Sequence, residues 1–189
     1  MFTKTACCLM LALALGVAPA RAASISFNVL SPAMVGSSFD VAVLVSDVFA
    51  GRSVTDTVVG FGFDVTIGDP SIFEYVDATE GPLFDPLILS TTPMVIGFST
   101  NLLGIGPGDF SGPLKLATLH FNVLSPGHTT LGVIGNSFPD SGLVFAELPY
   151  EAFNASVDVS TVPEPANLVL LGTGLLALAA VRRRLHRSK

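Results

Sequence analysis

The stretch Val59-Gly60-Phe61-Gly62-Phe63-Asp64-Val65-Thr66-Ile67 decides the fold of this protein, because every second residue in it is large and apolar. Gly, Asp or Thr stands at each position between them. A period of two places the large side chains on one face of a β-strand and the small or polar ones on the other. The stretch therefore predicts a strand with one face on a hydrophobic core.

The same alternation recurs along the whole middle of the chain. It is regular in three further segments, at 24–29, 39–46 and 153–159. Less regular candidate strands lie at 72–76, 87–90, 94–98, 114–123, 129–134 and 143–148. Turn residues such as Gly68-Asp69-Pro70 and Ser125-Pro126-Gly127 separate the segments, and no amphipathic helix of useful length lies between them. About nine short strands at this spacing predict an all-β fold, an antiparallel β-sandwich.

The N-terminus has the order of a secretory signal peptide. A single Lys4 precedes an apolar run at 6–17, and small residues follow it. Paired alanines at the −3 and −1 positions allow cleavage after Ala20 or after Ala22. We prefer Ala22, because cleavage after Ala20 would put Pro19 inside the site. The alternative is an uncleaved N-terminal helix.

Charge and cysteine are distributed unevenly. Between residues 24 and 162 two basic residues, Arg52 and Lys115, stand against fourteen acidic ones, a net charge of −12. So acidic a domain repels phosphate backbones, which argues against nucleic acid as a partner. Both cysteines of the chain lie in the signal peptide, so we expect the exported domain to be stabilised by its core without a disulfide.

The C-terminus combines an apolar run with a basic cluster. No charge interrupts residues 168–181, and five basic residues follow: Arg182, Arg183, Arg184, Arg187 and Lys189. A helix over this run rises about 21 Å, short of the ~30 Å hydrocarbon core, and arginine snorkelling with local thinning of the bilayer can cover the remainder. We predict one transmembrane helix at 166–181 and a basic cytoplasmic tail at 182–189, which places the preceding domain outside. A buried helix, the alternative, would not need this basic cluster.

The four residues just before the predicted helix are Val162-Pro163-Glu164-Pro165. Two prolines around one acid form a stiff, extended segment, which physical chemistry alone identifies only as a linker. With the apolar run and the arginines behind it, the segment resembles the PEP-CTERM sorting signal. The resemblance implies that an exosortase, a membrane-embedded enzyme similar to cysteine transpeptidases, recognises residues 162–165 in Gram-negative bacteria that make exopolysaccharide.

The middle region is similar to a cohesin-like domain. The resemblance lies in VGSSFDV at 35–41, VGFGFDV at 59–65, DPSIF at 69–73 and the stretch 114–131. It implies a jelly-roll sandwich of nine strands, related in shape to carbohydrate-binding modules, and it concerns shape more than ligand. The expected organisation is a signal peptide at 1–22, a cohesin-like β-sandwich at 23–160 and a sorting signal at 161–189.

Residues for catalysis or metal binding are scarce in the predicted sandwich. His120 and His128 are its only histidines, and it has no cysteine and no Gly-x-Ser-x-Gly motif. We expect a solvated His120 on the outer face of its strand and His128 in a turn, and no third ligand completes a zinc site with them. Carboxylate and carbonyl oxygens near turns could bind calcium, but no run has EF-hand spacing, and solubility is the default explanation of the acids. The acids near turns are Asp69, Asp77, Glu80, Asp85, Asp109 and Asp140.

Together these features favour a non-enzymatic protein of the envelope or extracellular matrix. We expect it at the inner membrane with its domain in the periplasm, and later at the cell surface, in a structural role or associated with exopolysaccharide. The first alternative is a module that binds a protein or glycan, although the chain lacks Trp and offers only Tyr75 and Tyr150 as polar aromatic platforms. A more distant alternative is an extracellular hydrolase. No cofactor is required by any of them.

Overall fold

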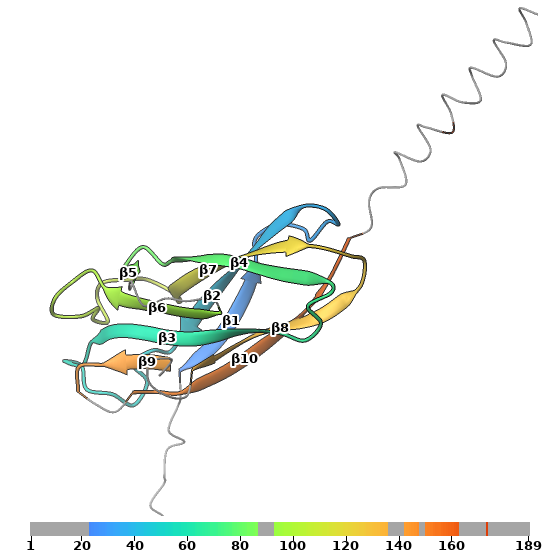
Figure 1. Cartoon of the computed structure of the whole chain (residues 1–189). Helices are drawn as coiled ribbons and strands as arrows, with labels where there is room; N and C mark the ends of the chain where they lie inside the picture. Colours follow the sequence, from blue (N-terminus) through green and yellow to red (C-terminus); the bar gives the residue numbers. More distant parts are fainter. Residues whose placement is uncertain (1–22, 87–92, 136–141, 148–149, 163–172, 174–189) are drawn as a thin grey trace, which may run out of the picture.

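The structure, a computed structural model, describes residues 23–86, 93–135, 142–147 and 150–162, and Thr173. Within these residues the chain forms ten β-strands that stack as two sheets (Figure 1). The strands are β1 (Ser24–Val29), β2 (Ser38–Ser46), β3 (Val58–Ile67), β4 (Phe73–Glu80), β5 (Phe84–Pro86), β6 (Met94–Ser99), β7 (Leu114–Val123), β8 (His128–Gly135), β9 (Gly142–Phe145) and β10 (Phe153–Ser160).

Every pairing between these strands is antiparallel, which confirms the all-β sandwich. One sheet has the order β1-β2-β7-β4 and the other has the order β10-β8-β3-β6-β5. Strand β3 is the centre of the second sheet. It pairs with β6 along one edge, while β9 and β8 share its other edge, β9 opposite Val58–Gly62 and β8 opposite Asp64–Ile67.

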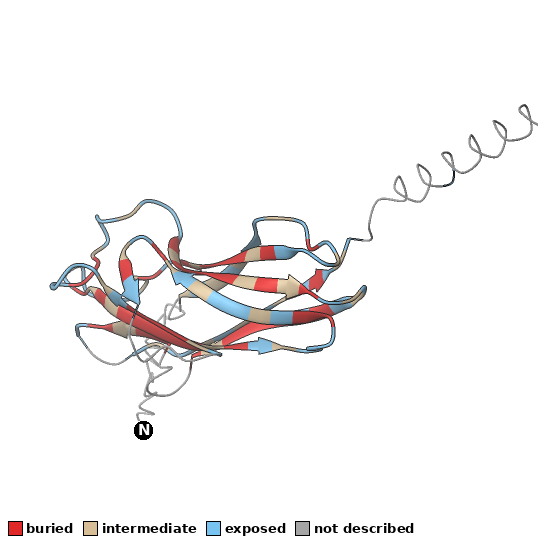
Figure 2. Ribbon diagram, turned by 45° about the horizontal axis from the view of Figure 1, so that its top comes forward, coloured by how far each residue is buried: buried red, intermediate tan, exposed pale blue. Residues whose placement is uncertain are grey.

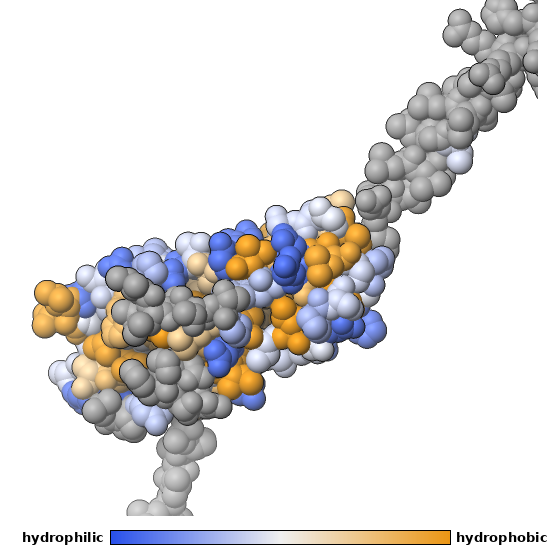
Figure 3. Space-filling model, viewed as in Figure 1, coloured by the Kyte–Doolittle hydropathy of each residue, from blue (hydrophilic) through white to orange (hydrophobic). Residues whose placement is uncertain are grey.

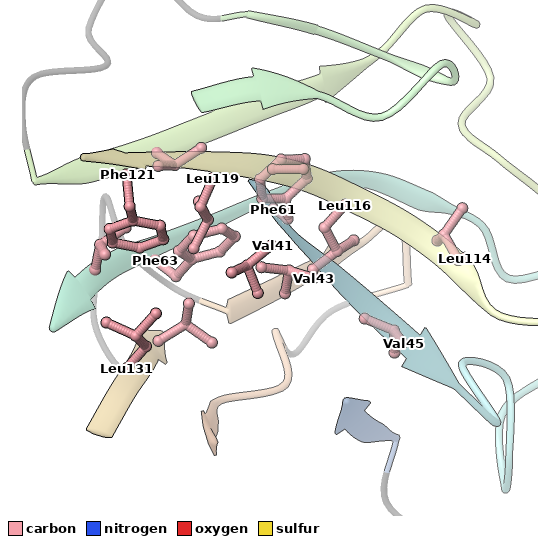
Figure 4. Close-up of a cluster of buried hydrophobic side chains, with 14 of the residues drawn as sticks. Val41, Val43, Val45, Phe61, Phe63, Leu114, Leu116, Leu119, Phe121 and Leu131 are labelled. Atoms are coloured by element: carbon pink, nitrogen blue, oxygen red, sulfur yellow. The ribbon is translucent and has the colours of Figure 1, made fainter. Parts of the chain in front are cut away.

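The core lies between the sheets and is built by the alternation seen in the sequence. Figure 4 shows apolar side chains of β2, β3, β7 and β8 converging in this space, and Figure 2 shows that buried residues recur along the strands. Each fully buried large apolar side chain contributes roughly 1.5–3 kcal/mol relative to exposure in water. The phenylalanines that are fully buried are Phe39, Phe61, Phe63, Phe73, Phe121 and Phe145.

One detail of β3 differs from the prediction. The alternation assigns Val59 to the core face, but Val58 is fully buried and Val59 is only partly so. The register between β3 and β9 shifts between Val58 and Gly60, so one extra residue is inserted there. Such a β-bulge reverses which residues face the core on its two sides. The pairing with β9 therefore sets the phase at this end of the strand.

The strand count is ten where about nine were expected. Strand β5 is only three residues long, too short for periodicity to reveal, and its pairing with Gly97–Ser99 of β6 defines it. The candidate strand at 87–90 lies outside the described residues. So does the predicted helix at 166–181, except for Thr173. In the part of the chain that the structure describes, no helix has the length and hydropathy needed to cross a bilayer.

Candidate functional site

The sorting segment is the site that the sequence predicts most specifically, and the structure describes its first residue. Val162 is described, whereas Pro163, Glu164 and Pro165 are not. The basic cluster from Arg182 to Lys189 and the cleavage-site residues Ala20 and Ala22 also lie outside the described residues. What the structure adds is therefore the way in which the sandwich holds the start of this segment.

Backbone hydrogen bonds hold the chain to the sandwich as far as Val162. Past the end of β10, the Thr161 amide donates to the Gly127 carbonyl at 2.9 Å, and the Gly127 amide donates to Thr161 Oγ1 at 2.9 Å. The Val162 amide donates to the carbonyl of buried Ala33 at 2.7 Å, and Val162 forms a parallel bridge with Met34. The hydrogen-bonded domain therefore extends to Val162, the residue just before the proline-flanked acid in the sequence.

Three loops meet at this end of the sandwich, at 30–37, 68–72 and 124–127. The Gly36 amide donates to the Val123 carbonyl at 3.0 Å, and the Leu124 amide donates to the Ile72 carbonyl at 2.8 Å. The three loops contain a single acid or base, Asp69. Hydrogen bonds from the hydroxyl and the backbone amide of Ser71 lower the pKa of Asp69, so this one carboxylate is engaged within its own loop.

A polar row crosses the outer face of the first sheet. Asp40 Oδ1 lies 2.7 Å from His120 Nδ1, and His120 Nε2 lies 3.0 Å from Thr79 Oγ1. Carboxylate, imidazole and hydroxyl stand here in the order of a hydrolase triad. A triad also needs donors aimed at a developing oxyanion. Amides within a sheet lie in its plane, so those of β4 and β7 do not point at an acyl group above Thr79. The row is thus suited to ordering the surface.

The position of His120 confirms one expectation and refines it. The residue lies on the outer face and its side chain is 30% exposed, as the strand pattern predicted. It is not simply solvated, however, because both ring nitrogens have a partner. Those partners, Asp40 and Thr79, are 80 and 41 residues away in the chain, so only the strand register brings them together.

His128 and the acidic residues do not assemble into a metal site. His128 is the first residue of β8, opposite Ser160 of β10, rather than part of a turn. It therefore lies in the other sheet from His120. Asp109 Oδ2 accepts a hydrogen bond from the Gly106 amide at 2.7 Å within its own loop. Among the described residues, which exclude Asp140, no group of three or more His, Cys, Asp and Glu side chains could hold a metal ion.

The sequence interpretation missed a charged cluster at the opposite end of the sandwich. Arg52 Nη1 lies 3.0 Å from Asp56 Oδ2, and Arg52 Nη2 lies 3.4 Å from Glu151 Oε2. Glu151 Oε1 in turn accepts a hydrogen bond from the Ala23 amide at 2.7 Å. The available signal was weak: Arg52 is one of only two basic residues in the exported domain. Its partners follow from tertiary folding alone.

Known proteins resemble this chain in two regions, the C-terminal sorting segment and the β-sandwich. Residues 161–184 match the family model of the PEP-CTERM protein-sorting motif. No curated protein matches the chain in sequence. The cohesin module of a family 33 glycoside hydrolase from Clostridium perfringens ATCC13124 is similar in structure, with a TM-score of 0.51 and 12% identity over 76% of this chain and 97% of that one. A chain from a type I cohesin–dockerin complex of Clostridium thermocellum has a TM-score of 0.46 and 13% identity over 75% of this chain and 100% of that one.

At such identities a structural likeness concerns the fold and leaves the ligand open. The likeness to the Clostridium perfringens module agrees with the two-layer antiparallel arrangement of β1 to β10. The sorting motif begins one residue after β10 ends. This chain therefore carries a PEP-CTERM protein-sorting motif directly behind a domain with a cohesin-like fold.

Proposed function

We propose that this protein is an exported, non-enzymatic component of the envelope or extracellular matrix, sorted there by an exosortase. The observation that carries the proposal is the junction at Val162, where the hydrogen-bonded domain ends and the sorting motif begins without a spacer. The basic cluster after residue 181 keeps the C-terminus in the cytoplasm, and the domain stands in the periplasm. After processing, the domain takes a structural or exopolysaccharide-associated role outside the cell.

The junction suits recognition by an enzyme within the membrane. Two prolines keep the segment around Glu164 extended, so little conformational entropy is lost when it binds in that form. The hydrogen bond from Val162 to Ala33 fixes where the segment starts. A segment that is stiff and attached to a folded domain samples few positions, which favours a defined cleavage site over general proteolysis.

The chemistry of the described residues supports a non-enzymatic role. The Asp40–His120–Thr79 row lies on the outer face of a sheet, with the Asp40 and His120 side chains 42% and 30% exposed. A water-exposed surface of this kind neither excludes solvent from a reacting bond nor strengthens the electrostatic stabilisation of a transition state. The row therefore lacks the environment that hydrolysis of a stable bond requires.

Substitution of the sorting segment tests the proposal. In the double variant Pro163→Ala/Glu164→Ala, uncut protein should accumulate in the inner membrane, as it should in a strain without its exosortase. The matched control is Asp158→Ala/Ser160→Ala on β10, just before the segment, which should be processed as the wild type is. Fractionation and intact-mass measurement follow both. Normal release of the Pro163/Glu164 variant would show that the tail is an ordinary anchor.

A second candidate function, binding of a protein or glycan, is favoured by an apolar tip at the end of the sandwich away from Val162. Leu102 is fully exposed there, and Leu103 and Val54 are 80% and 88% exposed. Thr57 Oγ1 donates to the Leu103 carbonyl at 2.8 Å and ties the two loops together. If purified protein binds the strain's own polysaccharide and Leu102→Ser/Leu103→Ser abolishes the binding, the module function replaces the structural one.

A further inference from the structure

The first residue that the structure describes, Ala23, contacts the charged cluster at the end of the sandwich where β1 begins. Its amide donates to Glu151 Oε1 at 2.7 Å, while Glu151 Oε2 lies 3.4 Å from Arg52 Nη2. Arg52 also pairs with Asp56, whose side chain is only 2% exposed. One arginine thus faces two carboxylates, and these three side chains sum to a charge of −1. The cluster can accommodate one more positive charge next to Glu151.

We propose that the signal peptide is cleaved after Ala22 and that the α-ammonium group created on Ala23 forms an ion pair with the partly buried side chain of Glu151. This inference rests on the proposed export. Hydrolysis of the Ala22–Ala23 peptide bond consumes one water, leaves a carboxylate on Ala22 and frees the Ala23 amine, which takes up a proton at neutral pH. A neutral amide donor then becomes a charged donor at the same place. Charge-assisted hydrogen bonds are roughly twice as strong as neutral ones.

The other predicted cleavage site does not produce this contact. Cleavage after Ala20 would leave Arg21 and Ala22 in front, so Ala23 would keep a neutral amide. The new amine would then start two residues away from Glu151. The contact thereby distinguishes between two sites that the alanine pattern alone left open.

The arrangement of the chain ends supports removal of the signal peptide. Ala23 precedes β1 at one end of the sandwich, and Val162 follows β10 at the other (Figure 1). The ten residues of β3 span about 33 Å between these ends. Only five residues separate the apolar run 6–17 from Ala23, and these reach roughly 17 Å at most. A domain standing on its C-terminal segment therefore could not keep both apolar segments in one membrane.

A double-mutant cycle tests the ion pair. Chains from Ala23 to Lys189 and from Ala22 to Lys189 are prepared in detergent, each with native Glu151 and with Glu151→Gln. With Glu151 present, the chain that begins at Ala23 should melt about 2–4 °C higher, the shift expected for a contribution near 1 kcal/mol in a chain of this size. With Glu151→Gln the difference should vanish. Glu147→Gln, whose carboxylate instead accepts from Thr55, is the matched control and should preserve it.

Two outcomes would overturn the inference. One is equal melting of the two chains with Glu151 present, and the other is a difference that persists in Glu151→Gln. Mass measurement of exported protein gives an independent check, with Ala23 expected as the first residue. An exported chain that begins at Arg21 would overturn the assignment and leave the export proposal intact. An exported chain that retains Met1 would overturn cleavage and favour the uncleaved N-terminal helix, whereas recovery of the protein only from the cytoplasm would contradict the export proposal as well.

A different observation concerns the opposite end of the sandwich, where the sorting motif begins. Apolar side chains are exposed near the point at which the chain leaves the domain, and Figure 3 shows apolar residues on the visible face there: Leu30 is 50% exposed, Leu124 52%, Val162 46% and Met34 36%. The three loops that carry or adjoin them contain one acid, Asp69, in a domain of net charge −12. Apolar side chains and near absence of charge coincide here.

We infer that this end, formed by loops 30–37, 68–72 and 124–127 with Val162, rests on the surface of the lipid bilayer while the protein is anchored. The inference depends on the anchoring that the proposed function includes. Five residues separate Val162 from the apolar run 168–181, and an extended chain of five residues reaches roughly 17 Å. Because Val162 is hydrogen-bonded to Ala33, the domain cannot move further from the membrane. Negatively charged headgroups would repel the rest of the domain more strongly than this end, which carries only Asp69 in its three loops.

Single-cysteine labelling tests the lipid contact, since the mature chain has no cysteine of its own. Environment-sensitive fluorophores are placed at Leu30→Cys and Leu124→Cys in the chain from Ala23 to Lys189, reconstituted in vesicles with lipid-attached quencher. Both labels should shift to the blue and be quenched. Leu102→Cys at the far end is the matched control and should behave as in water.

A third label at Ala177→Cys, within the apolar run, separates two kinds of failure. If that label is quenched while Leu30→Cys and Leu124→Cys behave as Leu102→Cys does, the lipid contact is wrong and anchoring stands. If Ala177→Cys is not quenched either, anchoring and the contact both fail. Shielding of Leu30→Cys only when exosortase is present in the vesicles would replace the lipid surface by a protein surface and would also overturn the inference.

Discussion

The guanidinium carbon of Arg52 lies 3.3 Å from the centre of the Phe145 ring. The same guanidinium makes its ion pair with buried Asp56, whose other oxygen accepts the amides of Thr57 and Glu147 at 2.9 and 3.1 Å. Arginine combines stacking on an aromatic ring with directed hydrogen bonds better than lysine does. This one side chain thus joins the β2–β3 loop to β9 and to the chain that follows β9.

We expect Arg52→Ala to be among the most destabilising substitutions in the domain. It leaves Asp56 buried without its cation, which typically costs about 3–5 kcal/mol of unfolding free energy. Arg52→Lys should lose less, because it keeps the charge. Lys115→Ala removes the only other basic residue of the domain and should change stability by less than about 0.5 kcal/mol. Urea unfolding measures all three, and equal midpoints for Arg52→Ala and Lys115→Ala would contradict the role of the cluster.

Gly135 of β8 lies where no side chain fits. A Cβ there would stand 2.6 Å from Gly142 Cα and 2.6 Å from the Gly62 carbonyl oxygen, and both are backbone atoms of neighbouring strands. Gly135→Ala should therefore cost about 1–3 kcal/mol, as overpacking of a core does. Gly108→Ala is the matched control, because a Cβ at Gly108 meets nothing within 4 Å. Thermal unfolding of the two variants should separate them, and equal melting temperatures would refute the close approach of β8 to β9.

Tyr75 should make the domain sensitive to high pH. Burial raises its pKa to about 12 from an ordinary value of 10.0, and the negative charges of Asp77 and Glu80 act in the same direction. The unfolded chain thus ionises at Tyr75 before the folded domain does. The stabilising contribution is complete below pH 10 and is lost as pH rises from about 10 to about 12. In Tyr75→Phe this part of the stability loss should be missing, whereas Tyr150→Phe should retain it. Identical pH profiles for wild type and Tyr75→Phe would count against the prediction.

The Asp40–His120 pair should contribute little to stability. Both side chains are partly exposed, at 42% and 30%, and exposed ion pairs contribute about 0–1 kcal/mol. A double-mutant cycle with Asp40→Asn and His120→Gln should therefore give a coupling free energy below about 1 kcal/mol. A coupling above about 2 kcal/mol would show that the row is a strongly coupled, preorganised unit. That result would reopen the hydrolase alternative.

The alternation in 59–67 was enough to predict strand β3, but not which valine at its start faces the core. Val58 and Val59 are equally apolar, and the choice between them follows from a bulge that only the pairing with β9 creates. The short strand β5 is similar, since three residues carry no period and β6 defines it by pairing. The local sequence pattern predicts that a strand forms, whereas pairing with the neighbouring strand sets its register.

By itself, the sequence determined the all-β class, most of the strands and the sorting motif. Each of these features depends on the spacing of residues that are close together in the chain. Only the tertiary structure decided that Val162 is docked on Ala33, that His120 sits between Asp40 and Thr79, and that Glu151 meets both Arg52 and Ala23. Ala23 and Glu151 are 128 residues apart. Contacts over such separations depend on sheet order and register. The packing of the two layers against each other sets both, and neither produces a periodic pattern in the sequence.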